Sequence, residues 1–405
     1  MKKFIAIIIL ILLIKNSSIS LQLKQNQFSK ASFSKTITKL AKDSNFKSLQ
    51  TNENFKIVLW KKSSFLRGAN LHPYKHFSPF SMRDLIKEKD LIELKKLGAN
   101  LIVANYPGVF TYFPPYEIDS LNLKNLDEIV RLTEKLDLFL VISIRSGPGK
   151  SLLTFFDKNL EDEFLFHDSL AQEKYIEMSK FITERYKKKK HLVGINFILE
   201  PHGDQPVYLE PIDDSIYFNF MDRLITEVRN IDSQIPIIIQ PQSWAYPDKF
   251  LSMKKFNDNK IVYSFNMYFP HAFTNEKNDS VYPGFYFDKD SLVYVDSTYL
   301  EKFLSPVIEF KKKHTVPVFV NEYGGIRFKR GIVNYIKDLH KLFLRNGFHF
   351  AIYVWRSEWG EIDGSKFDEY NYEKGIEIKF NSTIKNGNNQ NALLNELKSI
   401  WQMKR

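Results

Sequence analysis

The sequence predicts an α/β protein in which alternating strands and helices close into a single (β/α)8 barrel, the TIM-barrel architecture. Short apolar segments recur eight times along the chain, helical patterns lie between most of them, and 405 residues fit one barrel with insertions. An open doubly wound sheet is the alternative arrangement, but no Gly-x-Gly-x-x-Gly pattern follows the first strand. We therefore expect one domain over residues 55–405.

The eight predicted strands are nearly continuous in hydrophobicity, as is typical of strands that are buried on both faces. Such strands occur when helices cover both sides of a parallel sheet, which favours repeated βα units. The segments are 65–66, 101–104, 139–144, 192–199, 235–239, 261–265, 316–320 and 350–354.

Amphipathic patterns predict the helices between these strands. Ser81 precedes the first helix, and Gly98 and Gly347 follow the first and the last, which are typical start and stop signals. The fifth crossover, 248–256, is short and weak, and a helix over 391–403 completes the ring. The other predicted helices are 82–97, 126–136, 171–186, 217–231, 298–313 and 332–345.

The first twenty residues have the pattern of a signal peptide. Lys2 and Lys3 precede an unbroken apolar run over 4–14, and Ser18-Ile19-Ser20 offers small residues for cleavage. The run is shorter than the roughly 20 residues that span a bilayer, so a removed leader is favoured over a membrane helix. We expect a secreted protein, extracellular or periplasmic, with a polar segment or strap over 21–54 before the barrel.

Composition excludes several classes of protein. The chain has no cysteine, which rules out a disulfide scaffold, a thiolate metal site and a cysteine nucleophile. The formal net charge is +11, but the lysines are dispersed among acidic residues and only 187–190 is a dense run. We expect no nucleic-acid partner and no membrane contact after the leader is removed. A monomer is expected, although no pattern specifies the oligomeric state.

Two glutamates end predicted strands. Glu200 follows the fourth strand in Glu200-Pro201, and Glu322 follows the seventh in Asn321-Glu322-Tyr323-Gly324. A carboxylate at the end of a buried strand is costly unless it is paired or functional, and both of these would enter the same barrel mouth. Paired carboxylates across a cleft hydrolyse glycosidic bonds, one protonating the leaving oxygen and the other attacking the anomeric carbon.

Aromatic residues follow the last strands of the predicted barrel. Trp244 comes shortly after the fifth strand, Tyr268 and Phe269 after the sixth, and Trp355 at the end of the eighth. Because the C–H faces of sugars stack on aromatic rings, this cluster favours a carbohydrate ligand.

The chain resembles the cellulase-type family 5 glycoside hydrolases over about residues 57–380. The resemblance implies a retaining (β/α)8 enzyme with Glu200 as general acid/base, Glu322 as nucleophile, and Tyr268 and Trp355 beside the substrate. The motifs that carry it are Arg67-Gly68-Ala69-Asn70-Leu71, Leu97-Gly98-Ala99-Asn100, Gly147-Pro148-Gly149, Glu200-Pro201, Asn266-Met267-Tyr268-Phe269-Pro270, Asn321-Glu322-Tyr323-Gly324 and Trp355.

Four positions depart from the family pattern. Val103 occupies the position where family members usually have an arginine. Leu199 occupies the position of the asparagine that binds the sugar 2-hydroxyl. Arg145 and Asn266 each stand for a histidine. Arg145 could replace the missing positive charge near Glu322 and keep that carboxylate ionised, or it could indicate a different sugar substituent. We count Arg145, Asn266, Trp244 and His72 among the expected substrate-binding residues.

Other kinds of site are disfavoured. Gly147-Pro148-Gly149-Lys150-Ser151 lacks the first glycine of a phosphate loop, because Ile144 stands there. The sequence has no His-Glu-x-x-His motif, so His72, His76, His202 and His271 are not expected to form a metal site. It also has no Gly-x-Ser-x-Gly elbow, the motif of serine hydrolases with an α/β-hydrolase fold. Neither a metal nor an organic cofactor is expected.

We therefore expect a retaining hydrolase of a β-linked polysaccharide or oligosaccharide, with its carboxylates about 5–5.5 Å apart. Two alternatives stay open at this point. One is a secreted carbohydrate-binding barrel that has lost turnover, and the other is a binder of an anionic polymer with a steep salt dependence.

Overall fold

The computed structural model describes residues 55–71, 87–151, 164–203, 212–355, 369–374 and 392–403. The expected leader (1–20), the segment 21–54 and His72 lie outside the described residues. No helix in the described ranges is both long and apolar enough to cross a membrane.

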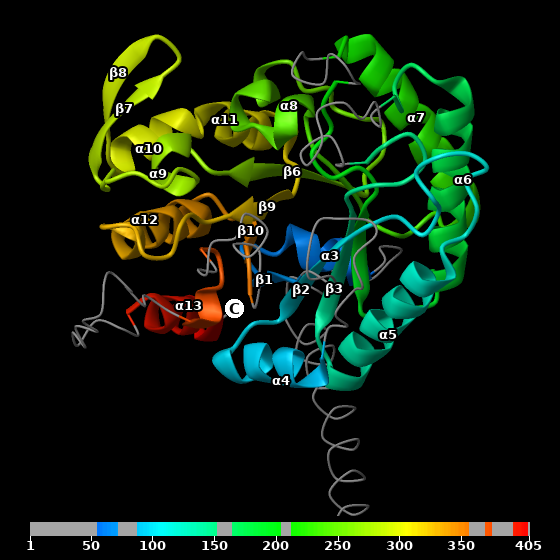
Figure 1. Cartoon of the computed structure of the whole chain (residues 1–405), viewed down its shortest axis with the longest axis horizontal. Coiled ribbons are helices and arrows are strands. Elements are labelled where there is room, and N and C mark those ends of the chain that lie inside the picture. Colours follow the sequence, from blue (N-terminus) through cyan, green and yellow to red (C-terminus); the bar gives the residue numbers. More distant parts are fainter. Residues whose placement is uncertain are drawn as a thin grey trace, which may run out of the picture.

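The described chain is a closed barrel of eight parallel strands with helices around it, so the predicted fold class is confirmed (Figure 1). Around the barrel the strand order is β1-β10-β9-β6-β5-β4-β3-β2. The carboxyl ends of all eight strands therefore open onto one mouth. The strands are β1 (Arg67–Leu71), β2 (Leu101–Tyr106), β3 (Phe139–Ile144), β4 (Leu192–Asn196), β5 (Ile237–Ile239), β6 (Ile261–Met267), β9 (Val318–Tyr323) and β10 (His349–Ile352).

The helices follow the predicted crossovers closely. Side chains of Asp119 and Asp168 accept hydrogen bonds from backbone N–H groups in the first turns of α5 and α6, and Gly98 ends α4 in a left-handed conformation. The long helices are α4 (Glu88–Leu97), α5 (Ser120–Leu136), α6 (Ser169–Tyr186), α7 (Asp214–Ile231), α11 (Ser305–His314), α12 (Ile332–Arg345) and α13 (Ala392–Gln402). The shorter ones are α3 (Phe55–Lys61), α8 (Gln242–Ala245), α9 (His271–Thr274), α10 (Ser297–Phe303) and the 3₁₀ turns η2 (Pro247–Leu251) and η4 (Tyr372–Lys374).

An antiparallel hairpin extends from the loop between β6 and β9 (Figure 1). It consists of β7 (Gly284–Asp288) and β8 (Ser291–Val295).

The expectation of one helix over 298–313 was wrong in detail. Two helices, α10 and α11, occupy that segment, and the chain is divided between them around Leu304 and Pro306.

The first strand was predicted at the wrong place. We expected it at residues 65–66, but β1 is Arg67–Leu71. Its sequence is not apolar, because Arg67 and Asn70 are buried with hydrogen bonds and Gly68 lies against β2. A Cβ atom on Gly68 would lie 1.7 Å from the Leu101 carbonyl oxygen, so glycine is required at this strand contact.

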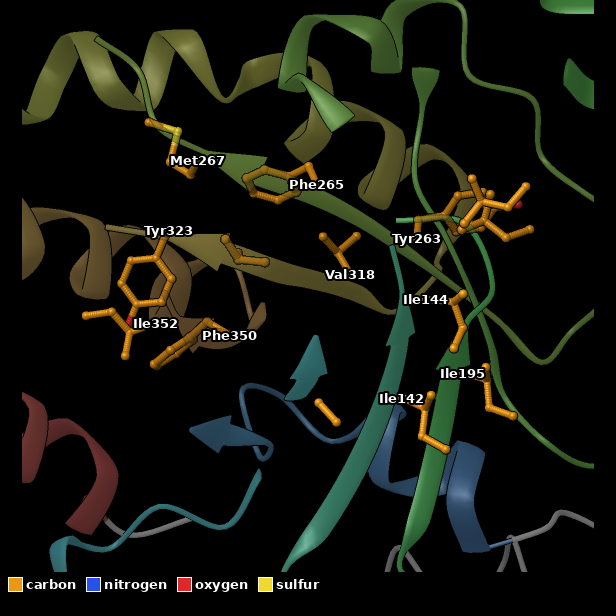
Figure 2. Close-up of a cluster of buried hydrophobic side chains, with 14 of the residues drawn as sticks. Ile142, Ile144, Ile195, Tyr263, Phe265, Met267, Val318, Tyr323, Phe350 and Ile352 are labelled. Carbon is orange, nitrogen blue, oxygen red and sulfur yellow. The ribbon is translucent and has the colours of Figure 1, made fainter. Parts of the chain in front are cut away.

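Two apolar clusters stabilise the barrel. The larger one lies between the outer faces of the strands and the surrounding helices, and Figure 2 shows part of it, including Ile142, Ile195, Phe265 and Phe350. The smaller one fills the inside of the barrel at the end opposite the mouth. There α3 contributes Trp60, whose Nε1 donates to the Val193 carbonyl oxygen at 2.8 Å.

A polar layer lies inside the barrel between this lower cluster and the mouth. Asn70, Asn196, Ser264 and Asn321 come from four strands and are fully buried. Asn70 Nδ2 donates to the carbonyl oxygens of Asn321 at 2.7 Å and of Ala351 at 3.2 Å. Asn70 thereby ties β1 to β9 and β10 just below the position of Glu322.

Candidate active site

Glu200 lies in the bend after β4, beyond the end of the strand at Asn196. Its backbone is left-handed, with φ of 52°, and its N–H donates to Gln240 Oε1 at 2.8 Å. Asn266 Nδ2 on β6 donates to Glu200 Oε1 at 2.7 Å, and Gln240 Nε2 donates to Asn266 Oδ1 at 3.1 Å. Gln240 therefore fixes both the backbone of Glu200 and the side chain that binds its carboxylate.

Glu322 lies within β9, and only 3% of its side chain is exposed. Its carboxylate accepts hydrogen bonds from three side chains. Asn105 Nδ2 donates at 2.6 Å and Arg145 Nη2 at 2.9 Å to Oε1, while the Tyr268 hydroxyl donates at 3.1 Å to Oε2. Both oxygens of Glu322 are therefore hydrogen-bonded.

Arg145 links the two carboxylates. Its Nη1 lies 2.9 Å from Glu200 Oε2, and its Nη2 lies 2.9 Å from Glu322 Oε1. The Arg145 Nε donates to Asn105 Oδ1 at 2.8 Å, which holds the guanidinium plane against β2. Because Arg145 is buried, this bridge acts in a low dielectric and is little screened by solvent.

The charges of the site interact strongly. Burial raises the pKa of Glu322 from 4.5 to about 8, and the charge of Glu200 adds to the rise. The Arg145 charge and the hydrogen bonds from Tyr268 and Asn105 oppose it. Burial also raises the pKa of Tyr268 well above its usual value, helped by Glu322, so its hydroxyl remains a donor.

Most of the residues predicted from the sequence come together here. Glu200, Glu322, Arg145, Asn266 and Tyr268 form one connected network of hydrogen bonds.

Two further predicted residues are not part of this hydrogen-bond network. Trp244 stacks on His202 beside Glu200. Trp355 is buried and packs edge-on against Trp401 of α13, with 6.2 Å between the ring centroids.

Tyr353, not Trp355, lies next to Tyr268. The two tyrosine rings meet edge to face with 6.3 Å between centroids. The strand β10 ends at Ile352, and Tyr353 packs with Ile326, Val354 and Tyr370 in a small apolar cluster that Tyr268 borders. Alternation along the strand could not have distinguished Tyr353 from Trp355, because the two residues are two positions apart.

Asn105 and Gln240 were also missed. Each is a polar residue at the end of a predicted apolar strand, which is the signal that identified the glutamates. Asn105 lies two residues after Val103, on the same side of β2, and so provides the polar contact to Glu322 that Val103 cannot make. Leu199 is fully buried and presents no polar side chain to the site.

The described residues contain no group of three or more side chains with the chemistry and spacing to hold a metal ion.

The closed barrel, with two acidic side chains meeting on one arginine at the ends of its fourth and seventh strands, has the architecture of a glycoside hydrolase. Residues 61–359 match the model of the cellulase family, glycosyl hydrolase family 5. The chain belongs to this family, which confirms the resemblance found in the sequence.

Characterised relatives agree with the assignment. Endoglucanase C of Acetivibrio thermocellus is 25% identical over 295 residues, which cover 65% of this chain and 82% of that enzyme. Cellodextrinase A of Ruminococcus flavefaciens is 21% identical over 303 residues, which cover 71% of this chain and 84% of that enzyme.

Solved structures share the fold. A glycoside hydrolase crystal structure superposes with a TM-score of 0.66 at 15% identity, covering 83% of this chain and 99% of that one. Cel5A of Thermotoga maritima, solved with cellobiose, gives a TM-score of 0.60 at 18% identity, covering 83% of this chain and 98% of that one. The same enzyme has also been solved with mannotriose, with a TM-score of 0.59.

Proposed function

We propose that the protein is a secreted, retaining hydrolase of β-linked glucans that uses Glu322 as nucleophile and Glu200 as acid/base. The observation that carries this proposal is the bridge of Arg145, whose two terminal nitrogens contact both carboxylates at 2.9 Å. Two carboxylates that bind the same guanidinium must lie close together. This favours a retaining enzyme, in which the carboxylates are about 5–5.5 Å apart, over an inverting one, in which the gap is wider.

In the first step, a Glu322 oxygen attacks the anomeric carbon while the glycosidic carbon–oxygen bond breaks. Glu200 donates a proton to the leaving oxygen, so that a neutral alcohol departs. Glu322 attacks in its ionised form, which burial disfavours and which the hydrogen bonds from Asn105 and Tyr268 and the charge of Arg145 favour. The product is a glycosyl ester of Glu322.

In the second step, Glu200 removes a proton from water and the water oxygen attacks the anomeric carbon. The ester bond to Glu322 breaks, and Glu200 regains the proton with which the cycle began. Asn266 and Gln240 hold Glu200 in place throughout, because Asn266 binds its carboxylate and Gln240 its backbone.

The usual contact to the sugar 2-hydroxyl requires another donor in this chain, because Leu199 has none. Asn105 and Arg145 are the amide and guanidinium donors nearest the nucleophile. We assign them to this role, together with a wall of the sugar pocket formed by Tyr268 and Tyr353. Trp244 is assigned to substrate contact on the other side, near Glu200.

The substrate class follows from the relatives. Endoglucanase C and cellodextrinase A are named for β-glucan substrates, and Thermotoga maritima Cel5A has been solved with cellobiose and with mannotriose. We therefore propose β-1,4-linked glucans first and mannans second. Secretion is proposed from the leader over residues 1–20, with the catalytic domain over 55–405.

The proposal is tested by product release from β-glucans, mannans and xylans. The wild-type protein should release reducing sugar from a β-glucan, and Glu322→Gln should lower the rate by several orders of magnitude. Glu309→Gln, which changes an exposed glutamate on α11, is the matched control and should retain activity. A wild-type protein that binds glucan without cleaving any of the polymers would overturn the proposed function.

A further inference from the structure

The hairpin of β7 and β8 has one exposed face that is almost entirely aromatic. Phe285 lies opposite Tyr294 and Phe287 opposite Leu292, so these four side chains share one side of the hairpin. Their exposed fractions are 68%, 49%, 70% and 60% in that order. Of the ten large apolar side chains that are exposed in the described ranges, four therefore lie on this one surface, which we call the aromatic face.

The other side of the hairpin fixes the aromatic face in place. Tyr286 and Val295 point the opposite way and are buried against the barrel domain. The Tyr299 hydroxyl of α10 donates to Asp288 Oδ2 at 2.8 Å, which holds the end of β7. On the exposed side, the rings of Phe285 and Tyr294 meet with 5.0 Å between their centroids. The aromatic face is thus preformed and needs no rearrangement before it can bind a ligand.

The hairpin belongs to the loops on the mouth side of the barrel but projects away from the catalytic network. It lies in the loop that follows the carboxyl end of β6. Its tip reaches the segment after β5, where Lys289 Nζ lies 3.8 Å from Asp248 Oδ2. Figure 1 shows it standing beyond α10, at the edge of the molecule. A ligand on the aromatic face would therefore lie outside the active site, on the side from which a substrate approaches.

Area and charge distinguish between the possible ligands of this face. Since an aromatic side chain contributes about 150–250 Å² when it is fully covered, the face offers on the order of 500 Å². A stable protein–protein interface buries about 800 Å² per partner, so the face is too small to hold a second copy of the chain. Asp288, Lys289 and Asp290 form the tip, and these charges oppose insertion of the hairpin into a lipid bilayer. The aromatic face itself has no charged side chain, which suits a neutral ligand.

We propose that the aromatic face is a second, non-catalytic binding site for a neutral β-glucan, and that it holds the enzyme on the surface of an insoluble polymer. This inference rests on the proposed function, which supplies a polymer of glucose as the ligand. Glucose units present apolar C–H faces that pack on aromatic rings without requiring a charged partner. Contact at the hairpin raises the effective concentration of the polymer at the active site. A short soluble oligosaccharide bound at the active site gains nothing from it.

The test measures how the protein partitions between solution and microcrystalline cellulose. The measurement uses the Glu322→Gln background, which prevents hydrolysis during the experiment. Adding Phe285→Thr and Phe287→Thr together should lower the ratio of bound to free protein at least fivefold. Threonine suits a β-strand, so the hairpin should remain folded. The matched control is Met403→Thr, at a side chain that is 45% exposed beside Arg67 of β1, at the end of the barrel opposite the mouth. It should not change the ratio.

A second measurement separates the aromatic face from the active site. With Glu322 intact, the double hairpin variant should keep kcat/KM for cellotetraose within twofold of wild type, because this substrate occupies the active site alone. Release of soluble sugar from microcrystalline cellulose should fall at least fivefold in the same variant. The unchanged rate on cellotetraose also shows that the variant is folded.

Equal partition of the hairpin variant and its parent onto cellulose would overturn the inference. So would a parallel fall in kcat/KM for cellotetraose, which would place the face inside the active site. Binding to phosphatidylcholine vesicles, or a dimer in sedimentation equilibrium, that the hairpin substitutions abolish would assign the face to a membrane or to a second copy instead. A wild-type protein that cleaves no β-glucan defeats the proposed function, whereas the partition measurement does not depend on turnover. If the double variant does not fold, partition of Phe287→Thr alone decides.

Discussion

Arg145 and Glu322 form a buried ion pair, with Nη2 of the arginine 2.9 Å from Oε1 of the glutamate. The second terminal nitrogen of Arg145 binds Glu200 at the same distance. One cation therefore serves two carboxylates inside the barrel mouth. The protonation state of the site, and hence its activity, depends on this single guanidinium.

The pH dependence of activity should reflect this bridge. We expect kcat/KM to rise as the pH increases toward about 8, because Glu322 must be ionised to attack and its pKa is raised to about 8. Arg145→Met should reduce kcat/KM about a hundredfold or more, because it leaves Glu200 and the buried Glu322 without their cation. Since Arg145 lowers the pKa of Glu322, the acidic limb should also move to higher pH in this variant. Arg145→Lys, which keeps the charge but not two separate donors, should show a smaller shift. An acidic limb that stays in place in Arg145→Met would show that the guanidinium does not control the ionisation of Glu322.

Glu322 should make the folded protein less stable as the pH rises. Its pKa is raised from 4.5 to about 8 in the folded state, so the native protein keeps this proton while the unfolded chain releases it. The free energy of unfolding therefore falls between about pH 4.5 and pH 8. Glu322→Gln removes this penalty, and its Tm relative to wild type should increase from pH 5 to pH 8. Glu309→Gln, at an exposed position, should show no such trend. A constant difference in Tm between Glu322→Gln and wild type would contradict the raised pKa.

A variant at Ser264 tests how the polar layer below the site affects stability. Its hydroxyl is buried, and it has no hydrogen-bond partner among the described residues. Ser264→Ala should leave the free energy of unfolding unchanged or raise it, because a buried hydroxyl without a partner is costly. Ser179→Ala is the matched comparison, since the Ser179 hydroxyl is equally buried but donates to the Tyr175 carbonyl oxygen at 2.8 Å. We expect that variant to lose about 1 kcal/mol in urea unfolding. Equal losses in the two variants would indicate that Ser264 also has a partner.

Trp355 should act on stability through its packing. Its ring is buried against Trp401 of the C-terminal helix, so Trp355→Ala should lower the free energy of unfolding by about 3–5 kcal/mol. Trp355→Phe fills more of the space and should lose less. Urea denaturation measures both. A loss below about 1 kcal/mol in Trp355→Ala would show that the contact with α13 does not stabilise the barrel.

Most strands of the barrel could be predicted from the sequence because they are buried on both faces. Continuous apolar segments such as 101–104 and 139–144 identify such strands directly. The first strand could not be found in this way, because Arg67, Gly68 and Asn70 are placed by specific contacts and not by hydrophobicity. Similarly, the stretch over 197–199 continues the apolar pattern of the fourth strand although β4 ends at Asn196.

The site could be predicted in part for a similar reason. Glu200 and Glu322 were recognisable as carboxylates after buried strands. The bridge of Arg145 depends on how far a side chain directly after β3 reaches across the mouth, which no local pattern in the sequence encodes. Trp355 was selected by its residue type, but the chain beyond β10 places Tyr353 beside Tyr268 and packs Trp355 against Trp401 of α13.

The most direct test of the account is to trap the proposed glycosyl-enzyme. A 2-deoxy-2-fluoro β-cellobioside with an activated leaving group should form a stable ester, because the fluorine slows both steps while the activated leaving group restores the rate of the first one only. Peptide mass spectrometry should then find the mass of one fluorinated cellobiosyl group on the peptide that contains Glu322, and no label in Glu322→Gln. A label on another carboxylate, or hydrolysis of a β-glucan with inversion at the anomeric carbon and no trapped intermediate, would contradict the assignment of Glu322 as nucleophile.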